Sequence, residues 1–194
     1  MQRQLKLEHI ISFADAIFAF SITFMAVTID IPKLAHNLTK TQVIDEFLKS
    51  IPEFEIYAIS FFVIGVYWIA YHQIFNQIVN SSTTVTWLTL AFLFFITLIP
   101  FATNLQVGFG YHILFVLFAL VLAMAGALLT ITWLHATKSK LIDKDLTPRE
   151  VHNISLEVIV PTVVFLLSIL VSFVELQAGI LLLDSNNTCQ DNIA

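Results

Sequence analysis

Residues 10–31 read IISFADAIFAFSITFMAVTIDI, an apolar run that ends at Pro32. A membrane-spanning helix needs about 20 mostly apolar residues, because the hydrocarbon core is about 30 Å thick and a helix rises about 1.5 Å per residue. The run is longer than the roughly 7–15-residue apolar region of a signal peptide, and an A-x-A cleavage site does not follow it. We therefore interpret it as a first transmembrane helix.

The composition of the whole chain has the same character. Of 194 residues, 58% are apolar and 12% are charged, whereas a soluble domain is about 45–50% apolar and about 25% charged. The formal net charge of −5 argues against nucleic-acid binding. The single cysteine, Cys189, excludes a disulfide framework and a Cys-rich metal site. The length allows one domain, 1–194, and the composition places this domain in a membrane.

Further apolar segments follow the first one. We expect transmembrane helices at about 10–31, 54–75, 85–101, 111–134, 154–174 and 176–187. The last segment is too short to span unless it recruits neighbouring residues or the bilayer thins locally. The predicted fold class is all-α, a polytopic membrane protein of six transmembrane helices.

The positions of lysine and arginine predict the orientation. With six helices and a cytoplasmic N-terminus, the basic residues of the N-terminal segment and of the loop between the fourth and fifth helices all fall in the cytoplasm. The positive-inside rule favours this arrangement over its inverse. We therefore expect a multi-pass protein of the cell membrane, in a bacterial inner membrane, with both termini cytoplasmic.

Polar residues inside the predicted spans are the candidates for function. Asp15 would cost roughly 2.5–3.5 kcal/mol at mid-helix if it faced lipid, and His72 is a more natural partner for it than a metal ion. A small-and-polar stripe passes through Asp15 and consists of Ser12, Asp15, Ala19, Thr23, Ala26 and Asp30. Such a stripe is typical of helix–helix packing, or else of a surface that faces water or ions.

Several function classes have no support in the sequence. The G-x-S-x-G and H-E-x-x-H motifs and a glycine-rich phosphate loop are missing, so we expect no enzymatic activity, no metal and no cofactor. Five glycines are too few for the carbonyl filter of common potassium channels. The pattern of the first helix does not recur, so an aqueous path would require a symmetric oligomer.

The first hundred residues carry an ordered set of motifs. His9-x-x-x-Phe13-Ala14-Asp15 begins the first helix, Tyr67-Trp68 and His72 lie in the second, and the third contains Trp87-Leu88-Thr89-Leu90. The set resembles the transmembrane-protein-175 family of potassium channels. Its signature residues here are His9, Phe13, Asp15, Trp68, His72 and Thr89. His9, Ala14 and Thr89 stand where the family signature has Arg, Ser and Asn.

The resemblance implies a potassium-permeable leak channel with modest selectivity for potassium over sodium. It implies a homotetramer with the first helix lining the pore, and its partners would be potassium ions, the lipid bilayer and further copies of the chain. Carried over by position, Phe20, Phe24 and Val27 form a hydrophobic constriction, because they share one helical face. Thr23 aligns with the selectivity residue, and Asp30 would collect cations at the outer mouth. We expect the constriction to face the axis and the small-and-polar stripe to pack against the second and third helices.

Two alternatives stay open at this point. One is a proton-coupled carrier or proton leak that uses Asp15 and His72, since intramembrane ionisable residues are functional candidates. Carriers usually have internal repeats and broken helices, and neither is obvious here. The other is a membrane scaffold without transport activity.

Overall fold

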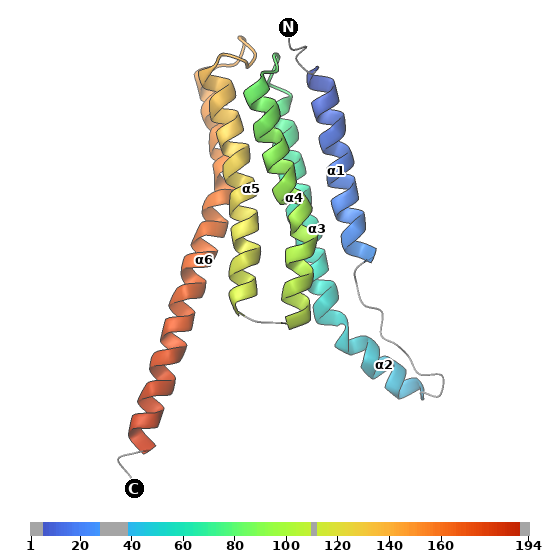
Figure 1. Cartoon of the computed structure of the whole chain (residues 1–194), viewed down its shortest axis with the longest axis vertical. Coiled ribbons are helices and arrows are strands. Elements are labelled where there is room, and N and C mark those ends of the chain that lie inside the picture. The colour runs from blue at the N-terminus through green and yellow to red at the C-terminus, as the bar shows by residue number, and fades with distance from the viewer. Residues whose placement is uncertain (1–5, 28–38, 110–111, 191–194) are drawn as a thin grey trace.

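A computed structural model describes the backbone of residues 6–27, 39–109 and 112–190, and their side chains except for 106–112 and 173–190. The described elements are the α-helices α1 (Leu7–Val27), α2 (Lys40–Lys49), α3 (Ile51–Phe75), α4 (Thr83–Phe109), α5 (His112–Lys138) and α6 (Pro148–Gln190). All except the short α2 run roughly alongside one another (Figure 1). The all-α fold class is confirmed.

Five stretches of the described chain are long and apolar enough to cross a membrane. They are α1, the stretch Lys40–Phe75, most of α4, α5 and the first part of α6. These stretches are helical because a helix pairs its own backbone polar groups and can therefore lie in hydrocarbon. The chain is therefore a multi-pass membrane protein.

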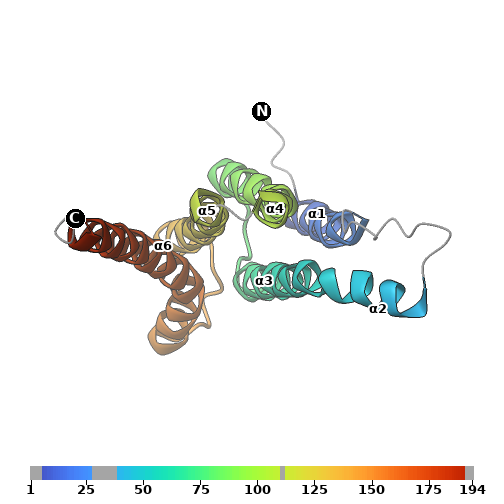
Figure 2. The same ribbon diagram turned by 90° about the horizontal axis from the view of Figure 1, so that it is seen from below.

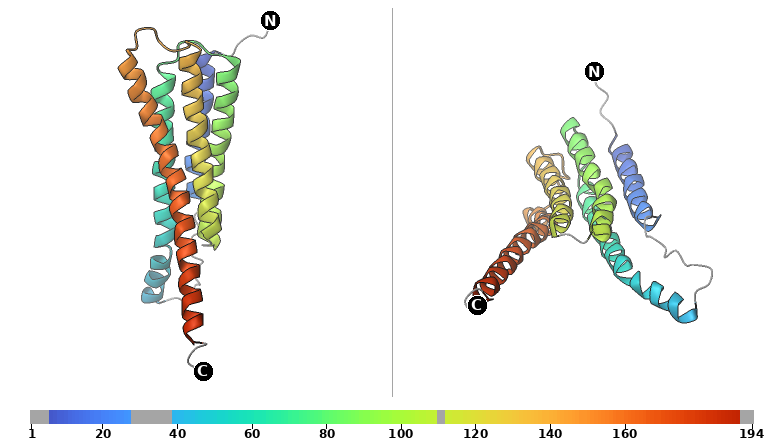
Figure 3. Two further views of the ribbon diagram at one scale, coloured as in Figure 1. Left: turned by 90° about the vertical axis from the view of Figure 1, so that its left-hand side faces the viewer. Right: turned by 60° about the horizontal axis from the view of Figure 1, so that its bottom comes forward.

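The expected sixth transmembrane helix is not a separate element. The predicted segments 154–174 and 176–187 both lie in α6, one continuous helix of 43 residues. The boundary between them was placed at Glu175, but a charged residue ends an apolar run without interrupting backbone hydrogen bonds. A helix of this length measures about 65 Å, well over the hydrocarbon thickness. It extends past the other helices, and its end lies opposite the start of α1 (Figures 1 and 3).

The third predicted helix also ends later than expected. The sequence places its end at 101, next to Pro100, whereas α4 passes through Pro100 and continues to Phe109. A proline removes one backbone hydrogen bond. The residues just before it, Ile96 and Ile99, are fully buried, so packing against neighbouring helices keeps this part of α4 helical.

Hydrogen bonds between helices accompany the apolar packing. Ser60 of α3 and Thr103 of α4 join their hydroxyls at 3.1 Å. Tyr67 donates to the Leu122 carbonyl of α5 at 2.7 Å, and the Trp133 indole of α5 donates to Ser155 of α6 at 2.8 Å. Each bond pairs polar atoms that would otherwise be costly inside a membrane.

The α3–α4 and α5–α6 connections meet at the end of the molecule where α1 begins (Figure 1). Val79 N donates to Leu141 O at 2.9 Å, and Asp143 N donates to Gln77 O at 2.8 Å. The basic residues in and beside the second connection, Lys138, Lys140, Lys144 and Arg149, are therefore held at the same end as the start of α1. Which side of the membrane this end faces stays a prediction of the positive-inside rule.

Candidate functional site

Helix α1 has one face packed against the bundle. The buried residues of this face are Ile10, Ala14, Phe18, Ser21 and Met25. They follow one another at three- and four-residue steps, so they form a single stripe. Figure 2, viewed along the bundle, shows α1 beside α4 and α3 at the edge of the molecule. The other side of α1 is left open in the protomer.

The open side of α1 contains a straight line of residues spaced by four and three, which we call the seam. The seam consists of His9, Phe13, Ala16, Phe20, Thr23 and Val27. All six are exposed, and Phe20 and Val27 are exposed by 61% and 80%. Alternating spacing of this kind is typical of helices that pack around a common axis.

The expected packing of the small-and-polar stripe is corrected by this arrangement. Ser12, Ala19, Thr23 and Ala26 are exposed instead of packed against neighbouring helices, and only Asp15 of the described stripe residues reaches α3. The face that packs is centred on Ala14 and Phe18 instead. This packed face combines the small residues Ala14 and Ser21, which are typical of membrane helix interfaces, with larger apolar side chains. Asp30, the expected outer-mouth residue, lies outside the described residues.

The residues of the expected constriction lie close together on the open side. The rings of Phe20 and Phe24 are stacked, with centroids 5.7 Å apart and an interplanar angle of 17°. The Thr23 hydroxyl donates to the Ala19 carbonyl, and it also lies 3.2 Å from the Phe20 carbonyl oxygen. A hydroxyl whose proton is used in this way presents its lone pairs as acceptors.

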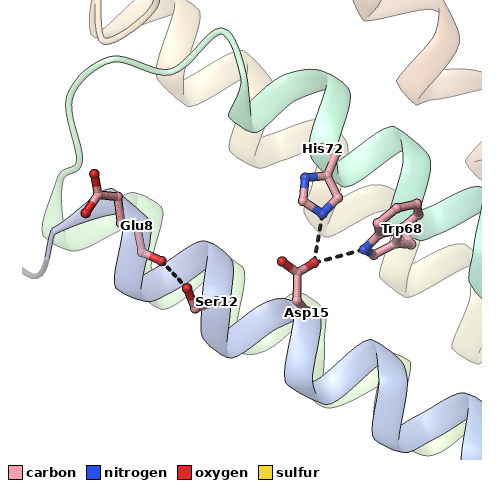
Figure 4. Close-up of polar contacts among 5 residues, drawn as sticks. All are labelled: Glu8, Ser12, Asp15, Trp68 and His72. Carbon is pink, nitrogen blue, oxygen red and sulfur yellow. Dashed lines mark hydrogen bonds and ion pairs between the residues drawn. The ribbon is translucent and has the colours of Figure 1, made fainter.

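Asp15 is held by two residues of α3. Its Oδ1 accepts a hydrogen bond from the Trp68 indole Nε1 at 2.9 Å and lies 2.8 Å from His72 Nε2 (Figure 4). Ser12, three residues before Asp15 on the same helix, donates to the Glu8 carbonyl at 2.9 Å. The carboxylate is 44% exposed and the imidazole 25%. Three of the six signature residues are therefore brought together.

Tyr71 supports this contact and was not singled out from the sequence. It is fully buried, its ring is edge-on to His72 at 5.6 Å, and it lies 4.1 Å from the Phe75 ring. Trp68 is likewise edge-on to His72, at 4.7 Å. The surrounding aromatic rings limit the rotamers of the His72 imidazole. They therefore keep its Nε2 oriented toward Asp15. The available signal was the adjacency of Tyr71 to His72, which is weak in a chain so rich in aromatic residues.

The other signature residues lie elsewhere. His9, Phe13 and Thr89 line an apolar pocket of about 310 Å³ between α1 and α4. The Thr89 hydroxyl donates to its own helix, at the Val85 carbonyl, with a distance of 2.8 Å. The two positions at which the family signature has Arg and Asn, His9 and Thr89, therefore border the same pocket. Within the described part of the chain, no group of three His, Cys, Asp or Glu side chains is placed to hold a metal ion.

Part of the chain matches the sequence profile of a known protein family. The sequence profile of the family described as "Endosomal/lysosomal potassium channel TMEM175" matches residues 9–100. This match contains the whole described seam, Asp15 and its partners on α3. The description of this family is that of an ion channel.

Three curated relatives are named as potassium channels. A potassium channel of Streptomyces collinus is 24% identical over 139 residues, which cover 66% of this chain and 63% of that protein. A potassium channel of Chryseobacterium is 29% identical over 93 residues, with 48% and 45% covered. One of Chamaesiphon minutus is 26% identical over 102 residues, with 52% and 49% covered. The chain thus spans about half to two thirds of the length of these relatives.

Two solved structures share the fold. The first is a lysosomal potassium-selective channel TMEM175 homologue from Chamaesiphon minutus, with a TM-score of 0.75, 22% identity and 91% and 92% of the two chains covered. The second is a variant of the potassium channel MtTMEM175 in complex with a nanobody fusion, with a TM-score of 0.60, 19% identity and 90% and 82% covered. At these identities the likeness establishes the fold, and it extends over nearly the whole chain.

Proposed function

We propose that this chain is the subunit of a potassium-permeable leak channel lined by α1. Its residues 9–100 match the sequence profile of the TMEM175 family. The observation that carries the proposal is the seam. It leaves Phe20, Thr23 and Val27 exposed on the side of α1 opposite its packed face. Copies of α1 packed around a symmetry axis would bury the seam and enclose a path along that axis.

Four copies of the chain would form the pore, each contributing one α1. Every pore-lining residue of α1 would then recur as a ring around the axis. Closed cyclic symmetry is the usual arrangement of such subunits. The ring of Asp30 carboxylates proposed for the outer mouth would then attract cations before they enter.

Phe20 and Phe24 are proposed to close the path together with Val27. Water is unfavourable inside a narrow apolar ring, so the ring dries and blocks ions without any charged group. The stacking of Phe20 on Phe24 supports this role, because it joins two aromatic rings into one bulky surface. Opening would require the four α1 helices to rotate or spread until the ring becomes wet.

Thr23 is proposed to supply the potassium preference. Its hydroxyl hydrogen is directed at the backbone of its own helix, so its oxygen can accept a partly hydrated cation. A ring of single hydroxyl oxygens provides far fewer ligands than stacked carbonyl rings. Selectivity for potassium over sodium should therefore be modest.

The test is potassium flux from liposomes loaded with potassium, comparing the wild type with Phe20→Ala. Removing the ring widens the constriction, so the initial flux should rise several-fold. The control is Phe62→Ala, because Phe62 is 70% exposed on α3 and lies off the seam. Equal flux in wild type and Phe20→Ala would remove Phe20 from the gate, and absence of flux in all three folded proteins would contradict the channel.

A second candidate function is a proton-coupled carrier or proton leak. The observation that favours it is the 2.8 Å contact between Asp15 and His72, a carboxyl group and an imidazole, both of which can carry a proton. Both side chains are partly exposed, so the described helices do not enclose them completely.

A pH-sensitive dye inside the liposomes separates the two functions. Proton flux that is lost in Asp15→Asn and unchanged in Phe20→Ala would favour the carrier or proton leak. Potassium flux that persists in Asp15→Asn and responds to Phe20→Ala would favour the pore.

A further inference from the structure

Helix α2 is separate from α3, and local sequence features determine where it begins and where it ends. At its start the Thr39 backbone N–H donates to Gln42 Oε1 at 2.9 Å, and together these residues form a capping box. At its end Ser50 separates it from α3, which begins with Ile51 and Pro52. Pro52 lacks the N–H that would continue the hydrogen-bond ladder of α2. The sequence therefore encodes a short helix joined to the start of a membrane span.

The two faces of α2 differ sharply. Its apolar face consists of Val43, Ile44, Phe47 and Leu48 and continues into α3 with Ile51 and Phe54. Its polar face carries Gln42, Asp45, Glu46 and Lys49, where Lys49 and Glu46 form an ion pair at 2.6 Å. No residue of α2 is buried, and Phe47 is 67% exposed. The helix therefore leaves its apolar face uncovered in the protomer.

The length of the continuous stretch decides where α2 can lie. Lys40–Phe75 contains 36 residues, which would measure about 54 Å as one straight helix, against about 30 Å of hydrocarbon. The 25 residues of α3 are enough to cross the membrane by themselves. The charged residues of α2 would also be costly inside hydrocarbon. In the ribbon α2 turns aside from α3 and projects away from the bundle (Figures 1 and 2).

We propose that α2 is an interfacial helix that lies on the membrane at the end opposite the start of α1, with its apolar face in contact with lipid acyl chains. Because α2 leads directly into the membrane-spanning helix α3, it is held at the boundary between headgroups and hydrocarbon. An amphipathic helix at that depth buries its apolar face in lipid and keeps its charges in water. Lys40 and Lys49, at its two ends, can reach lipid phosphates.

The inference can be tested by measuring depth in the bilayer. In a Cys189→Ser background, an environment-sensitive fluorophore is attached to Phe47→Cys or Ile44→Cys on the apolar face, or to Asp45→Cys on the polar face as the control. The full chain is reconstituted in phosphatidylcholine–phosphatidylglycerol liposomes that contain lipids with a nitroxide near the headgroup. Quenching by these lipids should be at least about twofold stronger at positions 44 and 47 than at position 45.

Two results would overturn the proposal. Equal, weak quenching at all three positions would place α2 in water. A blue-shifted emission at positions 44 and 47 without lipid quenching, but with quenching by a second labelled copy, would show that a neighbouring subunit covers the face. Two positions on the apolar face guard against a variant that fails to fold, as judged by its elution in detergent. The readout is independent of ion flux, so it stands apart from the proposed channel function.

Discussion

Asp15 shows how a single charged residue is accommodated in a membrane helix. Mid-helix insertion of an aspartate costs roughly 2.5–3.5 kcal/mol. The Trp68 indole and the His72 imidazole, both on α3, lie within hydrogen-bond distance of it. The residue thereby links α1 to α3 beside the open side of α1. These contacts join the two helices and also hold α1 at one rotation about its own axis.

Trp68→Phe should lower the stability of the protein by about 1 kcal/mol. The change keeps an aromatic ring but removes the donor to Asp15, whose side chain is 44% exposed. Thermal unfolding in detergent should show a lower Tm. Trp87→Phe is the matched control, because Trp87 is 68% exposed, and its Tm should stay at the wild-type value. A Tm equal to that of the wild type for Trp68→Phe would mean that the indole bond contributes nothing.

Thr23→Val should reduce the preference for potassium over sodium while leaving the overall flux within about threefold of the wild type. Valine keeps the shape of threonine but has no oxygen to accept a cation. The measurement is the ratio of potassium to sodium flux in liposomes under equal gradients. Thr97→Val serves as the control, because Thr97 is also exposed and bonded to its own helix, but on α4. An unchanged ratio in Thr23→Val would argue against a selectivity role.

At the scale of elements, α5 and α6 approach closely where a side chain is absent. A Cβ on Gly126 would collide with Thr162 Oγ1 and would lie within 3.3 Å of the Thr162 Cα atom. Small residues allow the backbones of membrane helices to come near each other. This close approach packs the first part of α6 against the bundle, while its continuation extends past the other helices (Figure 3).

Gly126→Ala should destabilise the protein by about 1–3 kcal/mol, because the added methyl group forces α5 and α6 apart. Thermal unfolding in detergent measures the effect. Gly65→Ala provides the comparison, since a Cβ there meets nothing within 4 Å, and alanine favours a helix by up to about 1 kcal/mol. If both variants unfold at the same temperature, the two helices are not packed as tightly as described.

For the whole molecule, the seam predicts where copies of the chain meet. In a Cys189→Ser background, Ala16→Cys on the seam should be linked between subunits by a short bis-maleimide, giving a dimer band on a denaturing gel. Leu167→Cys on α6 should give less product, because Leu167 is 53% exposed but lies away from α1. Cross-linking at Leu167→Cys alone would place the axis at α6 and contradict a pore lined by α1.

Much of the fold can be predicted from hydropathy, and the errors of that prediction have a common origin. The membrane character, the all-α class and the approximate places of α1, α3, α4 and α5 could be predicted because hydrocarbon admits only long, apolar helices. The split of α6 and the early end of α4 were wrong because Glu175 and Pro100 were taken as boundaries. Neither residue by itself stops a helix that packing or hydrogen bonding continues. The short α2 was missed because it is too polar to register as a span.

The chemistry of Asp15, His72 and Thr23 could be recognised in the sequence, since ionisable and hydroxyl groups are rare inside apolar runs. Which face of α1 is packed could not be read in the same way. Phe18 and Phe20 are the same type of residue, yet Phe18 is buried in the protomer and Phe20 is exposed. Lipid and protein interior are about equally apolar, so hydropathy does not distinguish a side chain that faces one from a side chain that faces the other. Only the packing of α1 against α3 and α4 separates them, and it thereby selects the residues left to face lipid or a pore.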